Sequence, residues 1–202
     1  MNDTIFQIII LIISVVIHEV SHGYAALWMG DVTAKYAGRL TMNPIKHLDP
    51  LGSIILPAIL VMSGSVFVVG WAKPVPYNPY NLRNQRWGEL FVAIAGPLSN
   101  ILIAIFISIF IRIGVGFGLT NTFINIAITA IFINLFLAIF NLVPIPPLDG
   151  SKILFNLFPK LSLRIRPFME MYSLVLLLGF IFFLSKFLVP VVIFSTYLLI
   201  GF

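Results

Sequence analysis

The chain has 202 residues with a formal net charge of +5, and 60% of the residues are hydrophobic while only 9% are charged. A soluble domain of this size could not cover so much apolar surface with so few charges, so the composition predicts an integral membrane protein. The absence of cysteine excludes disulfides and thiolate-ligated metals, and the twelve Lys and Arg form no basic cluster of the kind that binds nucleic acid.

The first predicted element is a membrane helix over Ile5–Met29, and four more apolar runs of similar character follow. A helix needs about 20 apolar residues to cross ~30 Å of hydrocarbon. The later runs are Gly88–Ile113, Thr120–Leu142, Phe168–Leu184 and Phe187–Phe202. The sequence therefore predicts an all-α polytopic membrane protein with about five transmembrane helices. We expect a single domain over residues 1–202, with a core over 5–150 and accessory C-terminal helices over 151–202.

The first of these helices carries the sequence His18-Glu-Val-Ser-His22 about halfway along its length. Histidines at positions i and i+4 lie on one helical face and can share one Zn²⁺, while Glu19 beside them can reach a metal-bound water. In this arrangement zinc activates the water and polarises the scissile carbonyl, and the glutamate acts as general base. Such polar residues are costly inside a membrane helix and are usually retained for function, although a polar cluster that joins helices is the alternative.

Two short segments after this helix, residues 31–44 and 69–79, favour extended backbone. Each places β-branched or aromatic residues between Gly, Asn and Pro, and Pro74 and Pro76 would keep the second segment at a sheet edge. They predict a small membrane-associated β-hairpin or sheet. An unwound substrate could add to its free edge as a strand; an ordinary surface hairpin is the alternative.

The run Leu51–Val69 between these segments is interrupted by Pro57 and by a Ser-Gly-Ser sequence, which weaken a continuous helix. If it crosses the membrane, the twelve Lys and Arg divide seven against five between the two sides; if it re-enters, they divide ten against two, with Arg112 and Lys186 as the minority. The second division agrees better with the positive-inside rule. We therefore predict a re-entrant or interfacial segment, with the N-terminus outside and the C-terminus cytoplasmic.

Two histidines leave a catalytic zinc one protein ligand short. His47 lies in a polar loop and is expected to be solvated. Asp149 follows a membrane helix in the sequence Asn141-Leu-Val-Pro-Ile-Pro-Pro-Leu-Asp-Gly150. Its three prolines prevent a regular helix and Gly150 permits a tight turn, so irregular backbone can carry the carboxylate toward a buried site. An N-cap for a helix beginning near Ser151 explains Asp149 equally well at this point.

Asn100 and Asn141 are two further polar residues at the predicted membrane helices. Each amide can donate to a developing oxyanion or hold the substrate backbone, so both are candidate catalytic residues. Hydrogen bonding between helices is the alternative for each of them, and it is the better account of Asn125 and Asn134.

Three motifs together resemble the site-2 protease family of intramembrane zinc metalloproteases. They are HEVSH in the first helix, Ala95-Gly-Pro-Leu-Ser-Asn100 in a later one, and the proline-rich motif Asn141–Gly150, and they span the chain from His18 to Gly150. The resemblance implies a three-helix catalytic core, one Zn²⁺ bound by the residues matching His18, His22 and Asp149, and Glu19 as general base. It also implies an active site toward the cytoplasmic side, with transmembrane proteins or peptides as substrates.

The chain resembles the compact members of that family, which carry neither PDZ-like nor CBS-like modules. Substrate choice is then expected to rest on the membrane core or on a separate regulatory membrane protein. The expected surroundings are the lipid bilayer of a prokaryotic inner or plasma membrane, and the sequence leaves the oligomeric state open. A zinc-binding or zinc-transport protein without peptidase activity would also explain the ligands, but it gives Glu19 no distinct task.

Overall fold

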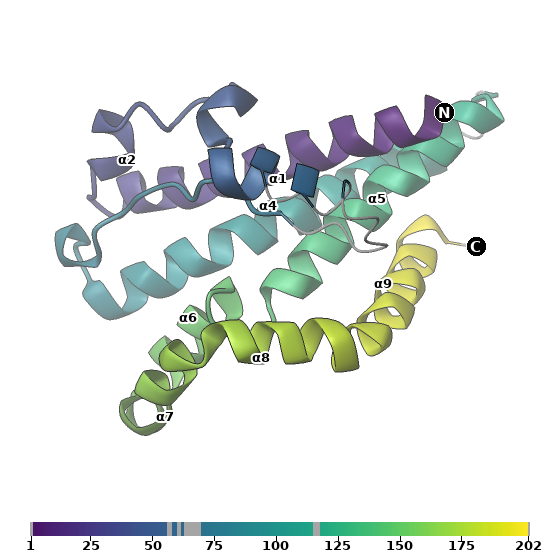
Figure 1. The fold of residues 1–202 in the computed structure, drawn as a ribbon. Coiled ribbons are helices and arrows are strands. Elements are labelled where there is room, and N and C mark those ends of the chain that lie inside the picture. Colours follow the sequence, from purple (N-terminus) through teal and green to yellow (C-terminus); the bar gives the residue numbers. More distant parts are fainter. Residues whose placement is uncertain (1, 56–57, 60–61, 63–69, 115–117, 202) are drawn as a thin grey trace.

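The computed structural model describes residues 2–55, 58–59, 62, 70–114 and 118–201, and it is mostly helical (Figure 1). Three long apolar helices form its centre: α1 (Asn2–Trp28), α4 (Gln85–Gly114) and α5 (Asn121–Asn141). Each is long and apolar enough to cross a membrane. Helix α4 packs against both α1 and α5. The predicted all-α membrane architecture is therefore confirmed at this level.

The C-terminal part consists of shorter helices. They are α6 (Asp149–Leu157), α7 (Pro159–Met171), α8 (Ser173–Gly179), the π-helical η5 (Phe180–Leu184) and α9 (Ser185–Ile200). Helices α7 and α8 meet at an angle of 82°. Helix α9 packs against α4 and α5, and Val192 of α9 is fully buried in a core that includes Ile131 of α5 and Ile111 of α4.

The predicted count of five crossings is not confirmed. Among the described residues three helices are long enough, or four if the bent pair of α7 and α8 counts as one span. Arg112, near the end of α4, donates hydrogen bonds of 2.8 and 3.0 Å to the carbonyls of Leu199 and Leu198. Helix α9 therefore ends at the end of the bundle where α1 begins (Figure 1). The prediction that the two termini lie on opposite sides of the membrane is not confirmed, because apolar runs of this length do not fix the direction of a helix.

The chain between α1 and α4 is built from short helical turns. They are α2 (Thr33–Tyr36), η1 (Pro44–His47), the π-helical η2 (Pro50–Ile55) and η3 (Pro79–Asn81). The predicted extended segment 31–44 is wrong at its start. There, Asp31 Oδ1 accepts hydrogen bonds from the backbone and hydroxyl of Thr33, which favours a turn over a strand.

The predicted β-hairpin is not confirmed. In the parts of this region that the structure describes, strand pairing is limited to one antiparallel bridge between Leu48 and Ala72. The segment around Ala72, predicted as a strand at a sheet edge, is otherwise irregular, and Val75 within it approaches Gly23 of α1. The predicted re-entrant run Leu51–Val69 begins in η2, and most of its remainder (56–57, 60–61 and 63–69) lies outside the described residues.

Candidate metal centre

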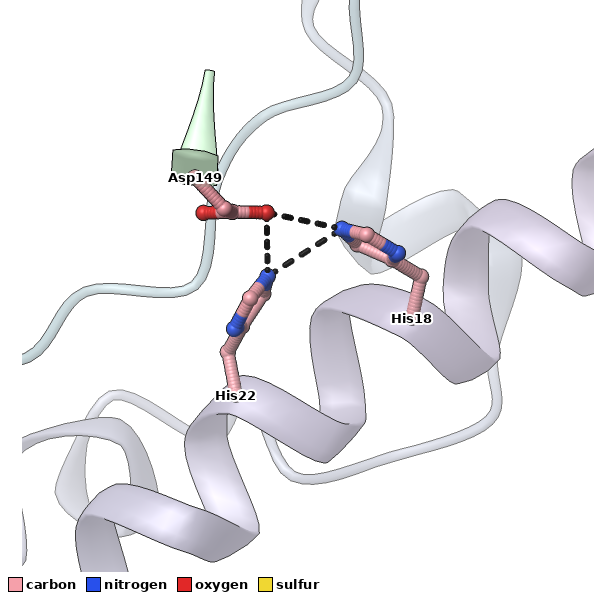
Figure 2. Close-up of side chains that lie close together, drawn as sticks. All are labelled: His18, His22 and Asp149. Atoms are coloured by element: carbon pink, nitrogen blue, oxygen red, sulfur yellow. Dashed lines mark hydrogen bonds and ion pairs between the residues drawn. The ribbon is translucent and has the colours of Figure 1, made fainter. Parts of the chain in front are cut away.

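The two histidines of α1 and the first residue of α6 meet at one point, although Asp149 follows His22 by 127 residues in the chain (Figure 2). Asp149 Oδ2 lies 3.2 Å from His18 Nε2 and 3.1 Å from His22 Nε2, and the two Nε2 atoms are 3.1 Å apart. All three residues are buried. Zinc bonds of about 2.0–2.1 Å at tetrahedral angles separate ligand atoms by about 3.3–3.4 Å, so this triangle has nearly the size of a zinc site.

Hydrogen bonds at the other ring nitrogens prepare both histidines for a metal. His18 Nδ1 lies 2.6 Å from Asn100 Oδ1, and His22 Nδ1 lies 2.6 Å from the backbone carbonyl oxygen of Val92. Both oxygens can only accept, so each ring donates its Nδ1–H and turns the Nε2 lone pair toward the centre. Two such lone pairs and a carboxylate oxygen repel one another unless a proton or a metal cation lies among them. The donor set of two imidazoles and a carboxylate fits Zn²⁺.

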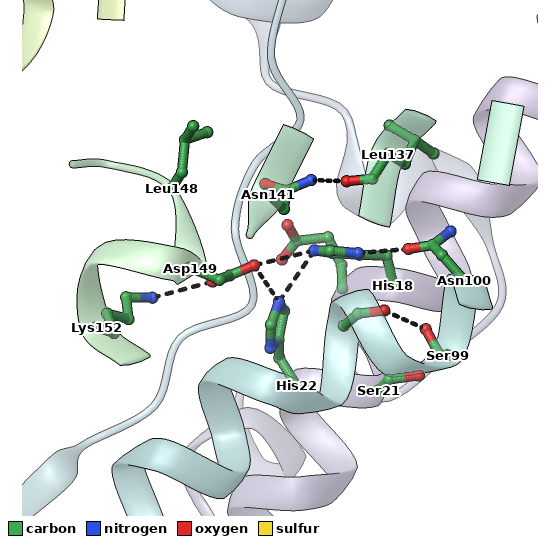
Figure 3. A network of polar contacts seen from close by, with 12 residues as sticks. His18, Ser21, His22, Ser99, Asn100, Leu137, Asn141, Leu148, Asp149 and Lys152 are labelled. Carbon is green, nitrogen blue, oxygen red and sulfur yellow. Dashed lines mark hydrogen bonds and ion pairs between the residues drawn. The ribbon is translucent and has the colours of Figure 1, made fainter. Parts of the chain in front are cut away.

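A chain of polar contacts fixes the orientation of Asn100, which is fully buried on α4. Its Nδ2 donates to Asn134 Oδ1 over 2.9 Å and to the Ser14 carbonyl over 3.4 Å. Asn134 Nδ2 in turn donates to the Ser14 hydroxyl over 3.0 Å. This network joins α1, α4 and α5 and obliges Asn100 Oδ1 to face His18. Figure 3 shows the resulting contact between Asn100 and His18. Asn134 therefore connects helices, as its sequence context suggests, and it also supports a residue of the metal centre.

Gly96 permits the close approach of α4 to the metal centre. A Cβ atom at this position would lie 2.4 Å from His22 Nε2 and 2.6 Å from His18 Nε2, which is closer than real Cβ contacts. Sequence reasoning included Gly96 in a motif but assigned it no role. The available signal was a glycine in the interior of an apolar helix, where it is unfavourable unless something approaches closely.

Asp149 reaches the centre through the irregular turn that follows α5. The Pro146–Pro147 peptide bond in this turn is cis. Leu148 is the N-cap of α6 and Asp149 is its first residue, so the interpretation of Asp149 as an N-cap is wrong. At Gly150 a Cβ atom would lie 2.2 Å from the Leu142 carbonyl oxygen, so only glycine lets α6 start this close to the end of α5. These contacts place the carboxylate against both rings.

The surroundings of Asp149 keep it ionised. Burial alone would raise the pKa of this carboxyl group. When a proton on Nε2 of a histidine takes the place of the metal, the hydrogen bonds with His18 and His22, together with the positive charge of Lys152, hold the pKa below its usual value. Lys152 contributes to this effect, since its Nζ lies 3.6 Å from Asp149 Oδ1 on the side away from the histidines (Figure 3). An anionic Asp149 is the form that binds a cation.

Glu19 lies next to His18 on α1 but is not part of the ligand triangle. Its Oε2 accepts a hydrogen bond of 2.9 Å from the backbone N–H of Val75. Val75 is buried in the irregular segment before η3, and its side chain approaches Gly23 of α1. The carboxylate is thus held beside the metal centre by a contact that the sequence did not reveal.

Asn141 and His47 are the remaining polar residues that the sequence analysis considered. Asn141 stands at the end of α5 beside the cluster, and its Nδ2 donates to the Leu137 carbonyl of its own helix over 2.9 Å (Figure 3). His47 is only 2% exposed, so the expectation that it is solvated is wrong. The turn η1 packs against α1, and His47 Nε2 lies 2.9 Å from the Thr41 carbonyl oxygen.

Comparison with known proteins gives a consistent family of matches. The model of peptidase family M50 matches residues 6–124 and 116–185. The chain is 38% identical over 194 residues to "Putative zinc metalloprotease YwhC" of Bacillus subtilis, an alignment that covers 92% of this chain and 81% of that protein.

More distant matches carry the same kind of name. Identity is 30% over 159 residues with "Putative zinc metalloprotease MJ0611" of Methanocaldococcus jannaschii, covering 74% of this chain and 72% of that protein. It is 28% over 147 residues with "Putative zinc metalloprotease Rip2" of Mycolicibacterium smegmatis, covering 69% of this chain and 52% of that protein. No solved structure matches the chain at comparable significance.

Proposed function

The chain belongs to peptidase family M50, the site-2 protease family, and is a zinc metalloprotease, and we propose that it hydrolyses peptide bonds in or near the transmembrane segments of other membrane proteins. One observation carries this proposal: a three-donor site of zinc dimensions lies buried among helices apolar enough to span a bilayer. A peptidase acting on soluble substrates has no need to place its metal there.

One zinc ion per chain would be held by His18, His22 and Asp149. Three protein ligands leave a fourth position open for water or substrate, which is the pattern of catalytic rather than structural zinc sites. Bound there, zinc would lower the pKa of a water molecule to about 7 and polarise the scissile carbonyl.

Glu19 is the proposed general base. Glu19 lies less than one helical turn before His22 on α1. The backbone N–H of Val75 binds its Oε2, so that Oε1 can face a zinc-bound water. The carboxylate accepts the proton of the attacking water and delivers it to the leaving amine nitrogen.

Asn100 and Asn141 receive different proposed tasks. Asn100 accepts a hydrogen bond from His18 with its Oδ1 and donates one to Asn134 with its Nδ2. It therefore acts as a positioning residue that fixes the ring of a metal ligand. Asn141 lies at the end of α5, and its Nδ2 donates a hydrogen bond to a carbonyl of its own helix. It can exchange that bond for a substrate carbonyl, which makes it the candidate donor to the oxyanion.

A transmembrane substrate must unwind before it can be cut, because its backbone carbonyls are already hydrogen-bonded within the helix. The segment from Ala72 to Pro76 runs past Glu19, and it contributes a backbone N–H directly to the carboxylate. An unwound substrate that paired with this segment would recover some of its lost hydrogen bonds at the right place.

The proposed membrane is a prokaryotic plasma membrane, in keeping with the bacterial and archaeal relatives. The metal centre lies toward the end of the bundle that carries most Lys and Arg, and the positive-inside rule then places it on the cytoplasmic side. The N-terminal end of α1 is outside, and the C-terminal end of α9 accompanies it, because both lie at the same end of the bundle (Figure 1).

Co-expression with a panel of tagged membrane proteins tests the function. The unmodified chain should produce substrate fragments that Glu19→Gln does not, while both forms contain equal amounts of zinc. Loss of a general base typically reduces the rate about 10²- to 10⁴-fold. A chain that cleaves no member of the panel yet carries zinc across vesicle membranes would instead support a transport function.

A further inference from the structure

A cationic pocket lies beside the segment that reaches Glu19. It has a volume of about 500 Å³. Three of its lining residues are positively charged and none is acidic; the lining consists of Ala37, Arg39, Lys46, Lys73, Pro74 and Pro76. None of these side chains belongs to the metal centre, so the pocket is a separate feature of the protein.

Arg39 is the buried element of this pocket, with only 8% of its surface exposed. Its Nη2 donates to the carbonyls of Lys73 and Pro74 over 2.7 and 3.3 Å. Its Nε is buried and has no hydrogen-bond partner among the residues that the structure describes. A buried guanidinium N–H without an acceptor is costly, so this group is suited to bind an acceptor that the described part of the chain does not provide.

The two lysines add positive charge at the mouth of the pocket. Both are exposed, and Lys46 Nζ makes one weak contact of 3.4 Å with the Gly38 carbonyl. None of the ion pairs in the described part of the chain involves Arg39, Lys46 or Lys73. A planar guanidinium beside two ammonium groups without carboxylate partners is a combination that suits a phosphate group.

The position of the pocket near one end of the candidate span in α1 indicates the source of such a phosphate. A Cβ atom on Gly23 would lie 2.5 Å from Leu40 and 2.9 Å from Val75, which are chain neighbours of the lining residues Arg39, Pro74 and Pro76. The segments that form the pocket therefore pack against the last two turns of the candidate span Thr4–Trp28. Exposed aromatic residues lie near this end, including Trp28 and Tyr36. Trp and Tyr concentrate where membrane and water meet, which is the level of the lipid headgroups.

We propose that this pocket binds the headgroup phosphate of an anionic phospholipid, with Arg39 as the buried anchor and Lys46 and Lys73 at its mouth. Inorganic phosphate shares this chemistry and is separated from the lipid by experiment. The proposal depends on the membrane location of the chain and not on its peptidase activity. A bound lipid would brace the segment from Lys73 to Pro76, whose residue Val75 also donates to Glu19.

Native mass spectrometry of the protein released from nanodiscs of mixed phosphatidylcholine and phosphatidylglycerol tests the proposal. The unmodified protein should retain phosphatidylglycerol. A basic residue near an anionic surface contributes about a fivefold increase in affinity, so Lys46→Gln with Lys73→Gln should bind it about 25-fold more weakly. Lys160→Gln, an exposed lysine of α7 outside the pocket, should leave retention unchanged.

Arg39 also donates hydrogen bonds to backbone carbonyls, so Arg39→Gln could disturb the fold and the lysine variants are preferred. Each lysine is also replaced singly, in case the double variant is unstable. A second arm adds inorganic phosphate to the detergent-solubilised protein. Retention of phosphatidylglycerol against added phosphate supports a lipid site, whereas its displacement supports the phosphate chemistry but not lipid selectivity. Equal lipid retention by the unmodified protein and the pocket variants would overturn the proposal. Zinc content and cleavage test the proposed function separately, and that result would not change them.

Discussion

The backbone N–H of Val75 donates to Glu19 Oε2 over 2.9 Å, and this contact joins the helix that carries both histidines to a segment 56 residues later in the chain. The donor is main chain and cannot rotate away, so it fixes one carboxylate oxygen while Val75 itself is buried against α1. We infer that the segment before η3 orients Glu19, the proposed general base.

Replacing Val75 with proline removes this donor. Hydrogen bonds to charged groups contribute about 1.5–3 kcal/mol, so we expect Val75→Pro to lower kcat by roughly ten- to a hundredfold. Zinc content should be unchanged, because Val75 does not contact the ligands. Val75→Ala keeps the N–H and serves as the control, with kcat close to that of the unmodified protein. If the two variants cleave a model substrate equally well, the hydrogen bond does not orient Glu19.

Substitution of Gly96 should damage the metal centre from the side of α4. The added methyl group of Gly96→Ala would overlap both Nε2 atoms, so either the rings or the helix must move. We expect zinc affinity to fall at least about 10- to 100-fold, as for residues that orient metal ligands. Gly179→Ala is the matched control, since nothing lies within 4 Å of a Cβ at that position. Competition with a zinc chelator measures both; equal affinities would mean that α4 does not pack here.

Asn100→Ala removes the acceptor that fixes the ring of His18. The Nδ1–H would lose its 2.6 Å partner, and the tautomer that presents Nε2 to the metal would be less favoured. We expect zinc affinity to fall about 10- to 100-fold, with cleavage restored in part by excess zinc. Asn125→Ala on α5 lies outside this network and should bind zinc normally. Normal zinc affinity together with lost cleavage would instead assign Asn100 to substrate or oxyanion.

Asp31 ties the end of α1 to the segment that carries Val75. It is fully buried, and its carboxylate accepts from the backbone N–H groups of Thr33 and Asn78 and from the Asn81 amide. Burial raises the pKa of Asp31, but these hydrogen bonds outweigh it and lower the pKa below its usual value. We expect Asp31→Asn to reduce the free energy of unfolding by about 1–3 kcal/mol, measured by thermal unfolding in detergent.

The pH dependence of this effect follows from the sign of the pKa shift. A group whose pKa is lowered by folding stabilises the protein above its unfolded pKa of about 3.9 and loses that contribution as the pH falls through its folded pKa. The difference in Tm between the unmodified protein and Asp31→Asn should therefore be constant above about pH 5 and shrink only in stronger acid. Glu170→Gln, which breaks an exposed ion pair with Arg166, should have little effect at any pH. A Tm difference that stays the same or grows as the pH falls below about 3.9 would contradict the shift.

The sequence singled out the three residues that meet in the candidate metal centre because their chemistry is local or unusual. Spacing alone places His18 and His22 on one helical face, and Asp149 is conspicuous as an acid in a proline-broken turn. Gly96 and Val75 were not assigned roles, because their importance arises from how closely α4 and the loop approach α1. No local pattern records such distances.

The fold was predictable where apolar runs were long. Helices α1, α4 and α5 agree with the predicted runs to within a few residues, while the two C-terminal runs were read as separate crossings. Their true course depends on contacts such as that between Arg112 and the end of α9. The loop after α1 was misread for a similar reason: one buried side chain, Asp31, organises it through partners almost fifty residues away.

Zinc analysis of the purified protein tests the central claim most directly. After equilibration with zinc and removal of the excess, the unmodified chain and Glu19→Gln should each hold about one zinc ion, as a site with three protein ligands predicts. His22→Ala and Asp149→Ala should hold almost none. A zinc-free unmodified protein, or undiminished zinc in both ligand variants, would contradict a metal centre built from His18, His22 and Asp149.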